Sequence, residues 1–293
     1  MFKGEYNKTI EYYEKSLKIF LDKLGPDHVH VANSYNNLGI VYYNEGEYNK
    51  AIEYYEKSLK ITLDKLGPDH ISVATSCNNL GSVYDDKGEY NKAIEYYEKS
   101  LKIRLDKLGP DHIDIAASYN NLGIVYKSKG EYNKAIEYHE KSLKIRLDKL
   151  GPDHIHVATS YNNLGGVYYN KGEYNKAIEY YEKSLKIKLD KLGPDHISVA
   201  NSYNNLASIY CSKKGYYKAM EFGKKALDLR LKKLDSNHPD IGITYNVLGD
   251  INCEKGNKME AKKCYENALS IYIQKLGKNH QRTQNVILKL KKL

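Results

Sequence analysis

The sequence has no tryptophan, and only 3 of its 293 residues are phenylalanine. It also lacks any run of about 18 apolar residues, so it predicts no transmembrane helix. The segment after Met1 lacks the charged and then apolar pattern of a secretory signal. The 4 cysteines show no CxxC spacing, which favours reduced thiols. These absences together predict a cytoplasmic protein with no membrane span.

Tyrosine, by contrast, is abundant, with 30 residues. Most of the tyrosines occupy equivalent positions in a repeated pattern, which favours a role in packing and a biased composition. The alternative is a surface on which aromatic rings stack against a ligand.

A Gly-Pro-Asp-His turn recurs every 42 residues along the chain. It begins at Gly25, Gly67, Gly109, Gly151 and Gly193, and degenerate versions begin at Asp235 and Gly277. Self-similarity at a fixed period of this size is the signature of a solenoid, in which each unit packs only on its neighbours. Such an array offers a long recognition surface rather than an enclosed pocket.

The repeat over residues 28–66 is typical of two antiparallel helices. Its first half (28–45) and its second half (47–66) both carry apolar residues at steps of three and four, the period of one helix face. Asp27 is the expected N-cap of the first helix, and Gly46 is its expected end. We call the two helices of each repeat helix A and helix B. The predicted fold class is therefore all-α.

Each repeat also carries a pattern of aromatic, leucine and small residues. In the first full repeat it consists of Tyr35, Leu38, Gly39, Tyr42, Ala51 and Tyr55. This pattern resembles the tetratricopeptide repeat, and the length of 42 residues with a Leu-Gly-Pro-Asp-His turn is similar to the repeats of kinesin light chains and nephrocystin-3-like proteins. The resemblance implies a right-handed superhelical solenoid whose A helices line a concave groove. The small Gly39 and Ala51 are expected to let helices A and B approach closely.

The repeat boundaries predict a single array over residues 1–293. It comprises a lone helix B at 4–24, helix pairs at 28–66, 70–108, 112–150, 154–192, 196–234 and 238–276, and a C-terminal capping helix at 280–293. The first helix lacks the helix A that should precede it, so we expect the chain to be a fragment or to begin at an internal start. The polar last helix has the composition of a cap.

Comparison of the repeats with one another separates a nearly constant helix B from a variable helix A. The variation falls on one stripe of helix A, with an unvarying asparagine in the middle of the stripe. The predicted peptide-binding residues are Asn36, Asn78, Asn120, Asn162, Asn204 and Asn246. The predicted groove-specificity residues are Asn33, Tyr43, Thr75, Asp85, Lys127, Thr159, Tyr169 and Asn201.

The unvarying asparagine has a physical use in recognition. Its amide offers donors and an acceptor, so it can pair with the backbone of an extended peptide whatever the peptide sequence. The alternatives are that it bonds only between adjacent repeats or reflects recent duplication. The following asparagine, such as Asn37, lies off the variable stripe and is predicted to form hydrogen bonds between repeats.

Features of catalysis and of cofactor or metal binding are missing. The glycines follow the repeat rather than forming a phosphate loop, and no nucleophile–base pair stands out. Seven histidines occupy the turns between repeats: His28, His70, His112, His154, His196, His238 and His280. Because packed helices are about 8–10 Å apart and zinc needs ligand atoms at about 2.0–2.1 Å, we expect these histidines to stabilise the turn. We predict no enzyme, no cofactor, no metal site and no small-molecule substrate.

The net charge of +9 is concentrated in one part of the chain. Residues 213–293 carry 18 lysines and arginines against 8 aspartates and glutamates, whereas the residues before them are nearly balanced. A localised basic surface can meet acidic proteins, anionic lipids or RNA, and a solvated surface with no partner is the alternative. Few aromatic residues accompany the basic ones, which disfavours nucleic acid.

These observations favour a non-catalytic protein-interaction scaffold that binds a peptide or helix of a partner protein in its concave groove. The resemblance points to a kinesin-light-chain-like adaptor, although no heptad region is present. One alternative is the ligand-recognition array of a larger signalling protein whose NTPase or transferase domain lies upstream. Another is RNA binding through the basic C-terminal third.

Overall fold

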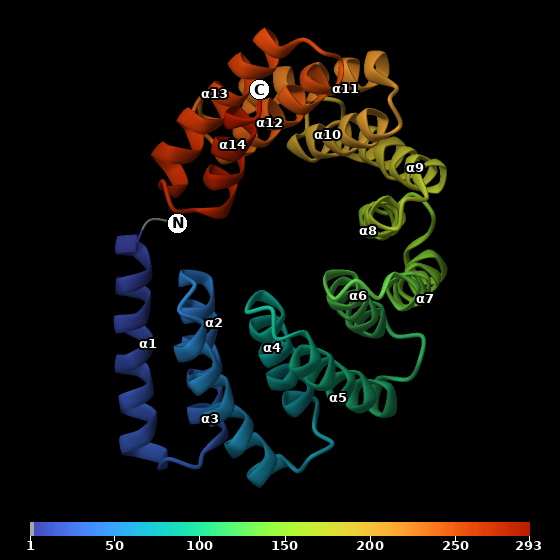
Figure 1. Cartoon of the computed structure of the whole chain (residues 1–293). Helices are drawn as coiled ribbons and strands as arrows, with labels where there is room; N and C mark the ends of the chain where they lie inside the picture. Colours follow the sequence, from blue (N-terminus) through green and yellow to red (C-terminus); the bar gives the residue numbers. More distant parts are fainter. Residues whose placement is uncertain (1–2) are drawn as a thin grey trace. The chain divides into compact units, whose positions relative to one another are not determined.

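The structure is a computed structural model that describes the backbone of residues 3–293 and the side chains of residues 6–293. All regular structure in the described residues is α-helical (Figure 1), which confirms the predicted fold class. The helices are α1 (Lys3–Leu24), α2 (Val29–Glu45), α3 (Tyr48–Leu66), α4 (Ile71–Asp86), α5 (Tyr90–Leu108), α6 (Ile113–Ser128), α7 (Tyr132–Leu150), α8 (Ile155–Asn170), α9 (Tyr174–Leu192), α10 (Ile197–Ser212), α11 (Tyr216–Lys233), α12 (Pro239–Glu254), α13 (Lys258–Leu276) and α14 (Gln281–Lys291). Within the described chain, no helix is long and apolar enough to cross a membrane.

The chain divides into two compact units, Met1–Lys149 and Leu150–Leu293. In both units the even-numbered helices are the A helices and the odd-numbered ones are the B helices. The most extensive contacts within each unit join an A helix to the B helix that follows it, as in α2 with α3 and α12 with α13. Each B helix then packs on the next A helix. We call the surface formed by the A helices of a unit its A face.

Histidine, rather than the expected aspartate, caps each helix A from α2 to α14. His28 precedes α2 in an extended conformation, and its Nδ1 accepts a hydrogen bond from the backbone N–H of His30 at 3.2 Å. All seven turn histidines act in the same way. The assignment of Asp27 as the N-cap was therefore wrong, because α2 begins two residues later, at Val29. The predicted turn-stabilising role of these histidines is confirmed.

Removing one histidine cap should measurably weaken its repeat. In the first unit, His70→Ala is expected to lower the free energy of unfolding by about 1 kcal/mol, because the backbone N–H of Ser72, in the first turn of α4, loses its hydrogen-bond acceptor. His70→Asn restores a side-chain acceptor and should lose less. Urea unfolding of the two variants checks this, and equal losses would show that the imidazole matters through packing alone.

The helices of a pair touch at glycine, as the repeat pattern predicted. A Cβ added at Gly39 would lie 2.6 Å from two ring carbons of Tyr55, and one at Gly81 would lie 2.7 Å from Cδ1 of Tyr97. Both tyrosine rings are buried. Only glycine allows this approach without displacing the ring.

Many of the remaining tyrosines form stacks capped by lysine. In the first full repeat, the rings of Tyr42 and Tyr54 stack at 5.3 Å with an interplanar angle of 5°. Lys50 lies 5.1 Å from the centre of the Tyr42 ring, and Lys57 lies 5.3 Å from that of Tyr54. Equivalent stacks recur in both units. These contacts account for much of the tyrosine content by packing and cation–π attraction.

Candidate functional site

The variable stripe of helix A is accessible on the A face. The second variable position is exposed in five successive repeats, at Asn33, Thr75, Ala117, Thr159 and Asn201. At the third variable position, Ile40 and Ile124 are 39% and 38% exposed. Exposed positions that differ between otherwise similar repeats can select among ligands without altering the core.

The paired asparagines form hydrogen bonds between neighbouring A helices. In the first unit, Nδ2 of Asn79 donates to Oδ1 of Asn36 at 2.9 Å, and Nδ2 of Asn121 donates to Oδ1 of Asn78 at 3.0 Å. In the second unit Asn205 donates in the same way to Asn162, at 3.0 Å. The predicted inter-repeat role of the second asparagine is confirmed. The first asparagine uses only its carbonyl oxygen in these bonds, and its amide N–H groups take no part in them.

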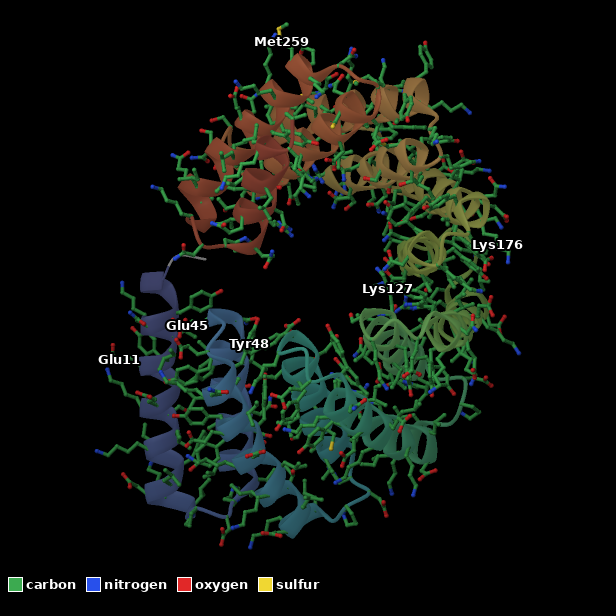
Figure 2. The ribbon with its side chains drawn as sticks, viewed as in Figure 1. Glu11, Glu45, Tyr48, Lys127, Lys176 and Met259 are labelled. Carbon is green, nitrogen blue, oxygen red and sulfur yellow. The ribbon has the colours of Figure 1, made fainter. Side chains whose placement is uncertain are left out.

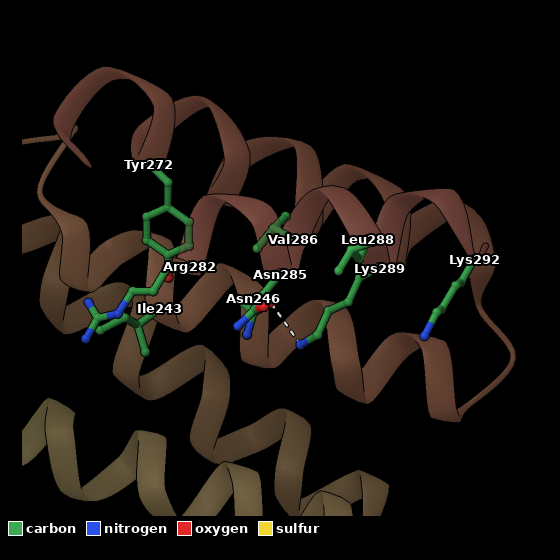
Figure 3. A pocket seen from close by; sticks show the side chains of 9 residues that line it. All are labelled: Ile243, Asn246, Tyr272, Arg282, Asn285, Val286, Leu288, Lys289 and Lys292. Carbon is green, nitrogen blue, oxygen red and sulfur yellow. Dashed lines mark hydrogen bonds between the residues drawn. The ribbon is translucent and has the colours of Figure 1, made fainter. Parts of the chain in front are cut away.

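The ladder of asparagines changes near the end of the second unit. Val247 stands where earlier repeats have the donor asparagine, and the Oδ1 of the buried Asn204 has no partner among the described residues. The ladder resumes at α14, where Nζ of Lys289 donates to Oδ1 of Asn246 at 3.0 Å (Figure 3). Lys289 also forms an ion pair with Asp250 at 2.6 Å. A cation therefore takes the place of the last amide donor.

The last variable position of the stripe behaves differently from repeat to repeat. Oη of Tyr43 donates to Oδ2 of Asp86 on the next A helix at 2.6 Å, and Oη of Tyr169 lies 3.2 Å from Oγ of Ser212. These two predicted specificity residues are thus joined to neighbouring helices. Asp85 and Lys127 occupy the same position on α4 and α6 and are half-buried (Figure 2 shows Lys127).

One functional feature was missed because helix B appeared nearly constant. A single position of helix B changes from Thr62 to four successive cations: Arg104, Arg146, Lys188 and Arg230. Burial lowers the pKa of each of these cations. This one-position variation was the sequence signal that could have revealed them.

The cationic side chains of helix B reach polar residues of the A helices. Nη1 of Arg104 donates to Oγ of Ser118 at 2.7 Å, and Nζ of Lys188 donates to Oγ of Ser202 at 2.9 Å. Nη2 of Arg230 donates to Oδ1 of Asn201, a predicted specificity residue, at 2.7 Å. Positive charge therefore lies beneath part of the A face, and it favours anionic groups above it.

A cavity of about 420 Å³ lies beside the last helix, between α12, α13 and α14. Arg282, Lys289 and Lys292 contribute its positive charge, and Ile243 and Val286 contribute apolar surface (Figure 3). Some of the excess basic residues of the C-terminal third therefore line this cavity. Within the described residues, no cluster of histidine, cysteine or acidic side chains is arranged to hold a metal ion.

Solved structures with similar folds include repeat proteins from several sources. BtubC (BKLC) from P. vanneervenii is 23% identical with a TM-score of 0.61, over 79% of this chain and 91% of that protein. A putative kinesin light chain with nearly identical TPR-like repeats from Podosopora anserina is 25% identical with a TM-score of 0.59, over 70% and 97%. The apo form of RapI is 20% identical with a TM-score of 0.70, over 97% and 93%.

Sequence comparison gives a family but no individual relative. No curated protein matches the chain. A model described as the tetratricopeptide repeat matches it six times, over residues 1–64, 31–106, 78–148, 114–190, 156–232 and 198–274. The chain therefore belongs to the tetratricopeptide repeat family.

Proposed function

We propose that this protein is an interaction scaffold that binds an extended peptide segment of a partner protein on its A face. The observation that carries the proposal is the exposed variable stripe beside a row of asparagines. In that row, Asn36, Asn78 and Asn162 accept one hydrogen bond through the carbonyl oxygen, while the amide N–H groups are not used in that bond. Those N–H groups suit the carbonyl oxygens of a peptide backbone.

Variable neighbours would supply selectivity in this arrangement. Thr75, Thr159 and Asn33 are exposed and can contact side chains of the peptide. Since backbone hydrogen bonds give affinity and side-chain contacts give specificity, the two kinds of position divide the work of recognition. The matched family is an interaction repeat, which agrees with a non-catalytic role.

A finer proposal is an adaptor of the kinesin light chain kind that acts in the cytoplasm. Its support is the likeness to the putative kinesin light chain, at 25% identity over 70% of this chain. The ligand-recognition array of a larger signalling protein is the competing proposal. Both use the same A face, so the experiment below tests what they share.

Replacing Asn162 with alanine is expected to weaken peptide binding by about tenfold, because the variant loses an amide that contacts the peptide backbone. The matched control is Asn205→Ala, which removes the same inter-repeat hydrogen bond but leaves the Asn162 side chain in place. The probe is a set of peptides selected from a random 12-residue library on the full chain. Affinity is measured by fluorescence anisotropy alongside Tm.

Equal losses of affinity in the two variants would refute the contact between Asn162 and the peptide. They would show instead that the ladder only aligns the helices. Failure of the full chain to enrich any peptide would refute the proposed function. Salt-dependent binding of single-stranded RNA that persists in Asn162→Ala would favour the basic C-terminal third as a nucleic acid surface.

A further inference from the structure

Two neighbouring A helices of the first unit carry opposite charges at the same repeat position. Asp85 lies on α4 and Lys127 lies on α6, 42 residues apart. The equivalent residues in the other repeats are tyrosines or cysteines: Tyr43, Tyr169, Cys211 and Cys253. Only these two repeats, therefore, place a fixed charge at this point of the variable stripe.

Neither charge is used inside the protein. Among the described side chains, the carboxylate of Asp85 and the ammonium of Lys127 form no hydrogen bond and no ion pair. The polar residues next to Asp85 on α4 already take part in other hydrogen bonds. Asp86 accepts from Tyr43 at 2.6 Å, and Oγ of Ser82 accepts from Oη of Tyr97 at 3.0 Å.

Keeping these two charges half-buried is unfavourable in the free protein. Burial, together with the nearby Asp86, raises the pKa of Asp85 to about 6. Burial lowers the pKa of Lys127. Both shifts show that the charged forms are poorly solvated, and an uncompensated charge of this kind destabilises a fold unless a partner neutralises it.

We infer that Asp85 and Lys127 read two opposite charges on the bound peptide, a basic side chain at Asp85 and an acidic one at Lys127. This inference rests on the proposed peptide-binding function. Packed helices lie about 8–10 Å apart, and an extended strand advances about 3.3 Å per residue. Because successive side chains of an extended strand point to opposite faces, two peptide residues reach the same A face only at an even spacing. The two charged residues of the peptide are therefore two positions apart, about 6.6 Å along the strand, in a fixed order.

The order of the charges gives the test. The random 12-residue library selected on the full chain should be enriched in basic and acidic residues at positions i and i+2, in one order only. A charge-swapped variant, Asp85→Lys with Lys127→Asp, should select the opposite order. Synthetic peptides with the two orders should differ by about tenfold in affinity for the wild-type protein and show the reverse preference for the variant.

A charge swap on a B helix controls for general electrostatic effects. Glu95→Lys with Lys99→Glu exchanges two exposed charges on α5 and should leave the selected order unchanged. Enrichment of peptides without a charge order, or an order that the Asp85 and Lys127 swap does not reverse, would overturn the inference while the dependence on Asn162 still stood. A library with no enriched peptide would overturn the inference and the proposed function together.

Stability provides a second readout. The single neutralising variants Asp85→Asn and Lys127→Gln should each weaken the selected peptides and raise Tm by roughly 2 °C, because each removes an unpaired half-buried charge. A fall in Tm in both variants would show that the charges stabilise the fold, which contradicts a role in ligand recognition.

Discussion

Replacing His139 with tyrosine is expected to stabilise the first unit at neutral pH and to remove much of its sensitivity to acid. His139 is 1% exposed, and neither of its ring nitrogens has a hydrogen-bond partner within the described residues. An unsatisfied buried polar group costs about 1–3 kcal/mol. His139→Tyr should recover a cost of this size at pH 7.

The surroundings of His139 are already known to accept tyrosine. Gly123 lies against its ring, and Ile124 follows on helix A. The first full repeat has the same combination of glycine and isoleucine, and there the residue is Tyr55, which is 2% exposed. Tyrosine is therefore expected to fit without strain.

Acid adds a second and larger effect. Burial, together with the nearby cations Lys127 and Arg146, lowers the pKa of His139 to about 3. Between about pH 6.5, which is the usual pKa of histidine, and pH 3, this side chain is protonated in the unfolded chain but not in the folded chain. Acid therefore destabilises the folded state through His139: there is no protonation penalty above pH 6.5, and the loss of stability grows as the pH falls, to about 3 kcal/mol at pH 4.

Chemical denaturation at pH 7 and pH 4 tests this expectation. His139→Tyr should lose less stability on acidification than the wild-type protein, and the reciprocal variant Tyr55→His should lose more. Parallel pH dependence of all three proteins would rule out His139 as an acid-sensitive group. A less stable His139→Tyr at pH 7 would show that the imidazole pocket is too small for the phenol.

The largest loss of stability is expected from a bulkier residue at the glycine contact of the second unit. Gly165→Val should reduce the free energy of unfolding by about 3 kcal/mol. A Cβ at Gly165 would lie 2.8 Å from Cδ1 of Tyr181, whose ring is buried between the helices.

The sign of the stability change in Gly165→Ala distinguishes this steric effect from helix propensity. Alanine is about 1 kcal/mol more favourable than glycine within a helix, so propensity alone predicts that Gly165→Ala stabilises α8. The contact with Tyr181 predicts a net loss instead. At the equivalent position the chain has Ala207, and the residue equivalent to Tyr181 is Gly223. Ala207→Gly should therefore cost only the propensity difference, which thermal unfolding can compare with Gly165→Ala.

The fold could be predicted from the sequence because the same local signals recur at a fixed period. A single helix boundary is uncertain by a residue or two, but six copies of a boundary reinforce one another. The helix contact at Gly39 was also predictable, since small residues next to aromatic ones indicate close packing. The exchange of Ala207 and Gly223 repeats that signal in reverse.

The interactions between repeats were harder to predict. The capping role fell to His28 because Nδ1 can accept a backbone hydrogen bond as a carboxylate does, although aspartate is the more common cap. The bond from Tyr43 to Asp86 joins residues 43 positions apart, and no local pattern indicates it. Contact of the asparagine row with a peptide remains a prediction, because the hydrogen bonds that Asn36, Asn78 and Asn162 accept within the protein give these residues a structural role that the sequence alone does not separate from ligand binding.

The asparagine ladder also has a consequence for how such an array can change in length. Asn79 bonds to Asn36 in the same way as Asn121 bonds to Asn78. If residues 70–111 were deleted, Asn121 would meet Asn36 and form the same bond across an interface of the same kind. Insertion or loss of 42 residues therefore creates no new type of junction. Recombination between copies can adjust the number of recognition positions, and hence the length of ligand read, without a redesign of the fold.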